Sequence, residues 1–165
     1  MSAELRGGEI AGLSLQVATD HPGLPQLAEF ERWVTIARGD ARVDGKREVT
    51  IRLVDSEESA QLNERYRQRQ GATNVLSFPA ASDELYKMLP DDEQELGALV
   101  ICAPLVEDQA RQQGKGEKDH WAHLTIHGML HLRGFDHQQE PERQQMEAME
   151  IALLEQLGIG NPYLS

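Results

Sequence analysis

Four of the six histidines in this chain lie close together, in the stretch HLTIHGMLHLRGFDH at residues 123–137. Histidine is a common metal ligand and the side chain that titrates nearest to neutral pH. The neighbouring residues are mostly apolar, which predicts a buried helix over about residues 118–133. Buried imidazoles need partners for their polar atoms, and a shared metal ion would provide one for several of them at once.

Helix geometry limits which histidines can share an ion. At about 100° per residue, His120, His123, His127 and His131 all fall on one face, so their direction does not select among them. Positions four apart are separated by about 6 Å along the helix axis, whereas zinc–nitrogen bonds are about 2.0–2.1 Å long. One helix is therefore expected to supply two ligands from adjacent turns, and a third ligand must come from outside it.

His137 is the expected third ligand. Gly134 suits the left-handed conformation that ends many helices, after which the chain can return His137 toward the same face. Only His127 and His131 lie next to this turn. The pattern H-x3-H-x2-G-x2-H therefore predicts a metal site formed by His127, His131 and His137, and the two earlier histidines of the helix are left as packing residues or as groups around the ligands.

Three protein nitrogens leave one position of a tetrahedral zinc ion open, which is typical of a catalytic zinc site. Such an ion makes hydroxide available at neutral pH by lowering the pKa of bound water to about 7. The alternative is a set of core histidines satisfied by backbone carbonyls. A second alternative is a zinc metallopeptidase, but the residue after the first ligand, where those enzymes carry a general-base glutamate, is Gly128 here.

The elements that would position this site alternate along the chain. Alternating or continuous apolar residues predict strands at about residues 13–17, 49–53, 74–78 and 98–102. Helical spacing with helix start and stop signals predicts helices at about residues 27–37, 55–66, from Pro104 onward, 118–133 and 141–158. Asp55 and Glu58 resemble a capping box for the second of these helices. The acidic stretch 80–96 is expected to be a solvated loop.

Composition favours one globular domain over residues 1–165, of which we expect residues 1–12 to be poorly ordered. No apolar run approaches the roughly 20 residues of a membrane span, and the first residues lack the pattern of a secretory signal. Cys102 is the single cysteine, which is typical of a reducing cytoplasm. Because the net charge is −12, any surface that binds nucleic acid must be a local basic one.

Two separate motifs resemble those of a known family, the YbeY endoribonucleases. HGMLHLRGFDH, residues 127–137, is similar to the family pattern H-G-x-L-H-L-x-G-Y-D-H, with Phe135 in place of tyrosine. LNERYRQRQGATNVLSFP, residues 62–79, resembles its second signature, L-N-x2-Y-R followed by T-[DN]-V-L-S-F-P. The similarity extends from about residue 47 to NPY near the C-terminus. One departure is Ala98, where the family usually has an aspartate.

The resemblance implies an α+β fold, a small mixed sheet of about four strands with about five helices and a metalloprotease-like metal-site helix. It implies that His127, His131 and His137 bind one zinc ion and that Arg67 is functionally important. The implied activity is metal-dependent endonucleolytic cleavage of single-stranded RNA in the cytoplasm, for maturation of the 3′ end of 16S ribosomal RNA and for ribosome quality control. The implied partners are the small ribosomal subunit and an assembly GTPase, with no membrane.

The chemistry of phosphodiester cleavage suggests that Arg67 binds the phosphate that is attacked. Negative charge develops on the nonbridging oxygens during attack, and a guanidinium group can bind them through two hydrogen bonds. A local basic strip is expected around it, formed by Arg65, Arg67 and Arg69 with help from Arg111, Lys115, Lys118 and Arg133. A different hypothesis is that the protein binds zinc but catalyses no reaction. It would then be a ribosome assembly factor whose fold the zinc ion stabilises.

Overall fold

The computed structural model describes residues 8–10, 12–38, 48–79, 95–135 and 139–163. The strands are β1 (Gly8–Ile10), β2 (Leu13–Ala18), β3 (Glu48–Val54), β4 (Val75–Pro79) and β5 (Glu95–Cys102). The helices are α1 (Leu27–Arg38), α2 (Ser56–Arg67), α4 (Ala103–Gln113), α5 (Glu117–Leu132) and α6 (Glu140–Gln156). The expected α+β fold is confirmed, with all four predicted strands and all five predicted helices in place.

The strands form one mixed sheet in the order β1-β2-β3-β5-β4. β2, β3 and β5 run parallel to one another, whereas β1 and β4 pair antiparallel with β2 and β5 at the two edges. β1 was not predicted from the sequence, and it lies within the segment that was expected to be poorly ordered. The acidic stretch 80–96 lies largely outside the described residues, which resume at Glu95.

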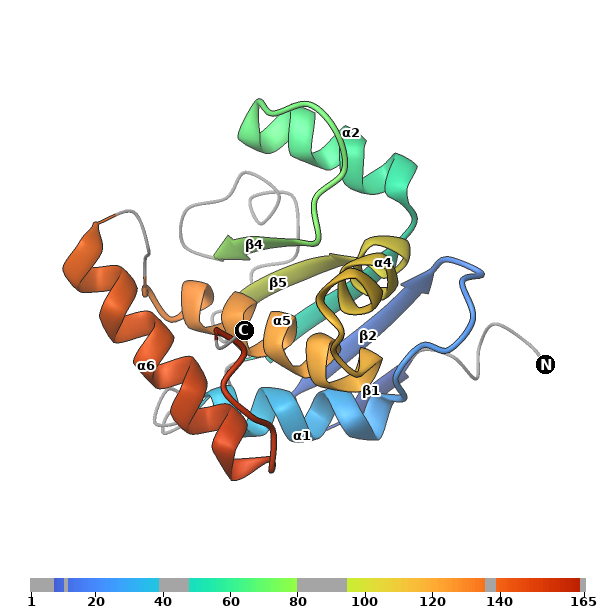
Figure 1. Cartoon of the computed structure of the whole chain (residues 1–165). Coiled ribbons are helices and arrows are strands. Elements are labelled where there is room, and N and C mark those ends of the chain that lie inside the picture. Colours follow the sequence, from blue (N-terminus) through green and yellow to red (C-terminus); the bar gives the residue numbers. More distant parts are fainter. Residues whose placement is uncertain (1–7, 11, 39–47, 80–94, 136–138, 164–165) are drawn as a thin grey trace.

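Each face of the sheet packs against its own set of helices (Figure 1). Successive strand residues point to opposite faces, so Val49, Ile51 and Leu53 of β3 join the larger core with α1, α5 and α6. On the other face, Leu76 and Phe78 of β4 pack with partly buried residues of α2. The histidine-bearing helix α5 and the helix α2, which ends at Arg67, therefore lie on opposite faces of the sheet.

The expected capping box of α2 is wrong. Asp55 is the residue before the helix, but its side chain makes no capping hydrogen bond and instead accepts one from Thr19. Glu58 forms an ion pair with Arg52 of β3, with Oε2 lying 2.6 Å from Nε. These two carboxylates thus join the start of α2 to β3 and to Thr19, the residue after β2, rather than capping the helix.

Among the described helices, none combines the length and apolar character that crossing a bilayer requires.

Candidate metal centre

α5 presents one stripe of histidines on an otherwise buried helix. From His120 to Leu132 every residue is buried except His123, His127 and His131, which are spaced four apart and partly exposed. The apolar residues between them fill the larger core. The predicted buried helix is confirmed. Between residues 120 and 132, the side chains that reach its surface are all imidazoles.

The imidazoles of His127 and His131 converge. Their Nε2 atoms lie 3.2 Å apart across one turn of α5. Two nitrogens bound at about 2.0–2.1 Å to a tetrahedral zinc ion are separated by about 3.3 Å, so this spacing fits shared coordination. The pair of adjacent-turn ligands proposed from the sequence therefore has the geometry that a zinc ion needs.

The end of α5 has the expected conformation. Gly134 has a φ of 100°, in the left-handed region that glycine adopts readily. The amide of Phe135 donates to the carbonyl of Leu130 at 3.0 Å, which closes the helix end. His137, the proposed third ligand, lies with its neighbour Asp136 outside the described residues.

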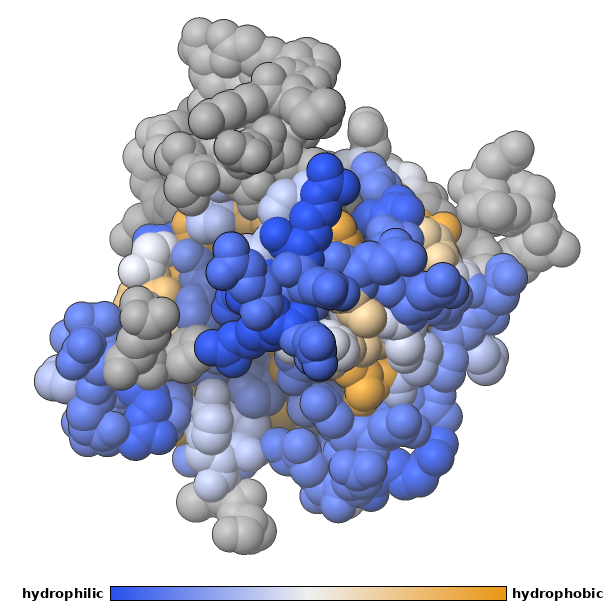
Figure 2. All heavy atoms as spheres, turned by 90° about the horizontal axis from the view of Figure 1, so that it is seen from above, coloured by the Kyte–Doolittle hydropathy of each residue, from blue (hydrophilic) through white to orange (hydrophobic). Residues whose placement is uncertain are grey.

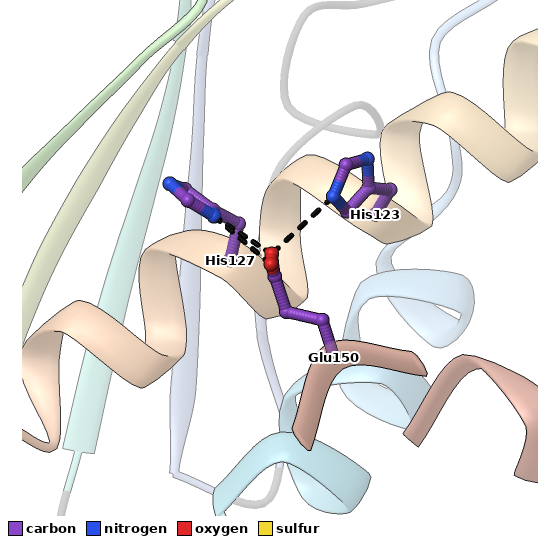
Figure 3. A group of neighbouring side chains, drawn as sticks. All are labelled: His123, His127 and Glu150. Carbon is purple, nitrogen blue, oxygen red and sulfur yellow. Dashed lines mark hydrogen bonds and ion pairs between the residues drawn. The ribbon is translucent and has the colours of Figure 1, made fainter. Parts of the chain in front are cut away.

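Glu150 of α6 is the main acceptor for this histidine stripe, and it belongs to none of the motifs in the sequence. Its side chain is fully buried. Nδ1 of His127 donates to Oε1 at 2.9 Å, and the hydroxyl of Tyr163 donates to both carboxylate oxygens at 2.6 Å. Nε2 of His123 lies 3.4 Å from the same Oε1. Figure 3 shows the carboxylate between the two rings, at the point where α6 crosses α5.

Burial of the Glu150 carboxylate opposes its ionisation, but the hydrogen bonds from His123, His127 and Tyr163 outweigh this effect and lower its pKa to about 2. Burial and the same carboxylate raise the pKa of the Tyr163 hydroxyl well above its usual range. Glu150 is therefore an anion with well-placed donors, and Tyr163 remains a donor at neutral pH.

The contact with Glu150 determines which nitrogen of His127 faces a metal. Because Nδ1 carries the proton that it donates to Glu150, the lone pair of the neutral ring is on Nε2, which points toward His131. A carboxylate that accepts from the second nitrogen is the usual partner of a metal-bound histidine. These residues therefore fit a metal ion held by Nε2 of His127 and His131.

A second grouping of the same side chains could also hold a metal ion. Single ligand atoms of His123, His127 and Glu150 all lie within 4.8 Å of one another. In this grouping Glu150 would be a ligand rather than an acceptor. We favour the first grouping because the oxygens of Glu150 already accept from Tyr163 and His127 in a fully buried position.

Gly128 is required by the packing of α5 on β5. A Cβ atom at this position would lie 2.8 Å from Cδ2 of Leu99 and 3.3 Å from Oγ of Ser77. The carbonyl of Gly128 also accepts a hydrogen bond from that serine at 3.2 Å. A glutamate at this position, as the peptidase alternative needs, would not fit between the helix and the sheet.

Arg67 is the last residue of α2 and its side chain is exposed. Asn63 and Ser59, both buried, tie the following loop to the helix through hydrogen bonds to the carbonyls of Gly71 at 2.8 Å and Thr73 at 2.8 Å. In the described part of the chain, no hydrogen bond or ion pair joins Arg67 to the histidine stripe. Asn63 of the motif LNERYR and the preceding Ser59 thus fix the loop that leads from Arg67 to β4, while the position of the Arg67 guanidinium relative to a metal ion stays a prediction.

The expected basic strip is smaller than the sequence indicated. Lys118 forms an ion pair with Glu29 at 2.9 Å, and Arg111 forms one with Glu107 at 2.7 Å. Nη1 of Arg133 donates to the carbonyl of Ala37 at 2.9 Å. The basic strip is therefore centred on the exposed arginines at the end of α2, which are Arg65, Arg67 and Arg69. Figure 2 shows a strongly hydrophilic face over this helix.

Ala98 does not weaken the histidine site directly. Its side chain belongs to the smaller core, with Leu76 and Val100, on the face of the sheet opposite to α5. The residue that replaces the family's usual aspartate therefore faces away from the imidazoles of His123, His127 and His131.

Comparisons with known proteins agree with these motifs. The family model described as endoribonuclease YbeY matches residues 22–158. The endoribonuclease YbeY of Nitrosococcus oceani is 50% identical over 151 residues, which covers 92% of this chain and 95% of that protein. The endoribonuclease YbeY of Alkalilimnicola ehrlichii is 46% identical over 165 residues, which covers 99% of this chain and 97% of that protein. A solution structure from Thermotoga maritima has a similar fold, with a TM-score of 0.53 and 20% identity over 92% of this chain and 99% of that one.

Proposed function

This chain belongs to the endoribonuclease YbeY family, and from that premise we propose that it is a metal-dependent endoribonuclease that cleaves single-stranded RNA. The observation that carries the metal dependence is the 3.2 Å separation of the Nε2 atoms of His127 and His131. His137 is proposed as the third ligand and one zinc ion as the cofactor. A zinc ion in this position would act as a Lewis acid toward a phosphoryl oxygen or an attacking water.

The chain's own residues prepare the site for that ion. Glu150 holds the proton of His127 on Nδ1 and keeps Nε2 available for coordination. Tyr163 donates to the same carboxylate and so holds the C-terminal tail against α5 and α6. Because α5 is packed into the larger core, the two imidazoles are held by a rigid element rather than by a loop.

Arg67 is proposed as the residue that binds the scissile phosphate. Its guanidinium is exposed and, in the described part of the chain, takes part in no ion pair, so it is available to an RNA backbone. Neighbouring Arg65 and Arg69 are exposed as well. A small cationic group on a chain with a net charge of −12 would attract the RNA backbone to this end of α2.

The biological substrate and partners are proposed from the family alone. They are 16S ribosomal RNA during maturation of its 3′ end, the small ribosomal subunit in quality control, and an assembly GTPase. We propose a cytoplasmic location on the same basis, together with the lone Cys102.

Cleavage assays on protein purified without an affinity tag test the proposal. We expect endonucleolytic products from single-stranded RNA, fewer from a duplex of the same sequence, and loss of cleavage after chelation with recovery on adding zinc. Digestion of an unstructured protein while RNA stays intact would instead support the peptidase. A metal-loaded protein that cleaves neither polymer would contradict the proposal and favour the non-catalytic assembly factor.

A further inference from the structure

A pocket of about 360 Å³ adjoins the histidine stripe and is not used by the chemistry proposed above. His123 and His127 of α5, Gln109 and Gln113 of α4, and the tail residue Tyr163 all line it. Its volume is at the lower end of the range for small-molecule sites, about 300–1,000 Å³. The pocket can therefore take one small group of a polymer whose backbone lies at the metal centre.

Carboxamides give the pocket its polar character. Oε1 of Gln109 accepts from Nδ2 of Asn74 at 3.1 Å and from Nε2 of His120 at 3.0 Å. These two donors fix the orientation of the amide, because its oxygen must face them. The Nε2 group of Gln109 then keeps both N–H donors, and no residue in the described ranges accepts a hydrogen bond from it. The exposed amide of Gln113, at the end of α4, adds a further donor and acceptor.

Two buried nitrogens at this pocket also lack partners among the described residues. They are Nδ1 of His120 and Nδ1 of His123. Burial, helped by the neighbouring His123 and Lys115, lowers the pKa of His120 to about 4, so its ring is neutral and Nδ1 is an acceptor while Nε2 donates to Gln109. Buried polar atoms without partners are uncommon in native proteins and indicate a missing ligand or water.

The charge of the pocket favours a neutral occupant over a phosphate. Lys115 is the cationic side chain among the described lining residues, and its Nζ already donates to the carbonyl of Pro162 at 2.9 Å. Amide side chains recognise the edges of nucleobases through paired hydrogen bonds. Tyr163, which also lines the pocket and is 43% exposed, offers an aromatic ring on which a base can stack.

We propose that this pocket binds one unpaired nucleobase of the RNA, next to the phosphate that is cleaved, and that Gln109 and Gln113 determine which base is preferred. The inference rests on the proposed endoribonuclease function. Proteins that read single-stranded RNA take bases out of the stack in this way, hydrogen-bonding their edges and stacking their faces.

Cleavage of a single-stranded RNA pool with random sequence, read by sequencing the product ends, tests this assignment. The parent should prefer one base at a fixed position beside the cut by about fivefold or more, which corresponds to the lower end of a paired amide contact. Gln109→Met and Gln113→Met should each reduce that preference to below about twofold. Gln112→Met is the matched control, because Gln112 is equally exposed on α4 but does not line the pocket, and it should retain the parent preference.

The variants at exposed Gln113 and Gln112 keep the test valid if Gln109→Met fails to fold. A parent without base preference, or a preference that survives in Gln113→Met, overturns the inference while leaving RNA cleavage itself intact. If the parent does not cleave RNA at all, the proposed endoribonuclease function is contradicted, and the pocket must be tested separately. Titration with the four free nucleosides then decides the pocket: saturable shifts of the His120 ring resonances support it, and their absence for all four overturns it.

Discussion

Nδ1 of His127 on α5 lies 2.9 Å from Oε1 of Glu150 on α6, which places a fully buried carboxylate directly behind a proposed metal ligand. This contact fixes the tautomer of His127 and places the lone pair of the ring on Nε2, the nitrogen toward His131. If His127 is a metal ligand, as proposed, correct packing of α6 on α5 supports its coordination.

Replacing this carboxylate should therefore weaken the metal site without removing a ligand. We expect Glu150→Gln to reduce zinc affinity by about 10- to 100-fold, the usual effect of losing a carboxylate behind a ligand histidine. Competition with a chromogenic chelator measures the affinity. Glu147→Gln is the control on the same helix, because that side chain is partly exposed and 3.6 Å from Arg143. Equal zinc affinity in parent and Glu150→Gln would contradict the role given to this carboxylate.

The two possible groupings of metal ligands predict opposite effects for two histidines on one helix. If Nε2 of His127 and His131 bind the ion, His131→Ala should lose most of its bound zinc, whereas His123→Ala should retain it. The grouping of His123, His127 and Glu150 predicts the reverse. Elemental analysis of both variants, purified without an affinity tag, distinguishes them. Retention of stoichiometric zinc by His131→Ala would rule out the ligand set that we favour.

The sequence predicted most of the fold because its strands are marked by local patterns. Alternating Leu13 and Leu15, and alternating Val49 and Ile51, are buried as expected. The three-residue strand β1 has too few residues for an alternating pattern to be visible, and its pairing depends on the neighbouring β2. Register with a neighbour is not a property of one short segment.

The site was predicted less completely than the fold. His127 and His131 follow from spacing on one helix, but Glu150 acts across two helices and no motif connects them. One signal was present: Glu150 occupies an inward position of α6, together with Met146 and Leu153, where a carboxylate is uncommon. The capping box failed for a related reason, because Asp55 and Glu58 bind tertiary partners that local sequence does not reveal.

Arg67 offers a test of phosphate binding that leaves metal and fold unchanged. Arg67→Ala should reduce cleavage of single-stranded RNA by roughly 10²- to 10³-fold, as expected for one donor to the developing charge. Zinc content should stay at the parent value, and the free energy of unfolding should change by less than about 0.5 kcal/mol, because the side chain is exposed. Arg32→Ala is the control, because Arg32 is also exposed but lies on α1, on the opposite face of the sheet from α2. Cleavage by Arg67→Ala at the parent rate would remove Arg67 from the mechanism.

Gly128 should be sensitive to even a single added methyl group. A Cβ at this position meets Cδ2 of Leu99 at 2.8 Å, so in Gly128→Ala either this buried side chain or α5 must shift, and the fold should be destabilised by roughly 1–3 kcal/mol. Urea unfolding of the metal-free protein measures the change. Gly116→Ala is the comparison, because the nearest described atom to its Cβ is 3.7 Å away, in ordinary contact. Parent-like stability of Gly128→Ala would show that the helix has room to shift.

His120 should make the fold sensitive to mild acid. Its side chain is 3% exposed, and its pKa is lowered from 6.5 to about 4, first by burial and then by the nearby His123 and Lys115. Between these two pH values the unfolded chain binds a proton at His120 that the folded chain excludes. The free energy of unfolding therefore falls as the pH is lowered from 6.5, and this contribution levels off below about pH 4.

Over the whole window this effect amounts to roughly 3 kcal/mol, from about 1.4 kcal/mol per pKa unit. His120→Gln removes the titrating group and keeps an amide that can donate to Gln109, so its free energy of unfolding should fall less steeply between pH 6.5 and 4. Urea unfolding at several pH values, with chelator present so that metal loss does not contribute, gives both slopes. Because only the slopes are compared, a constant packing cost in the variant does not matter. Parallel slopes for parent and variant would show that His120 does not carry this acid sensitivity.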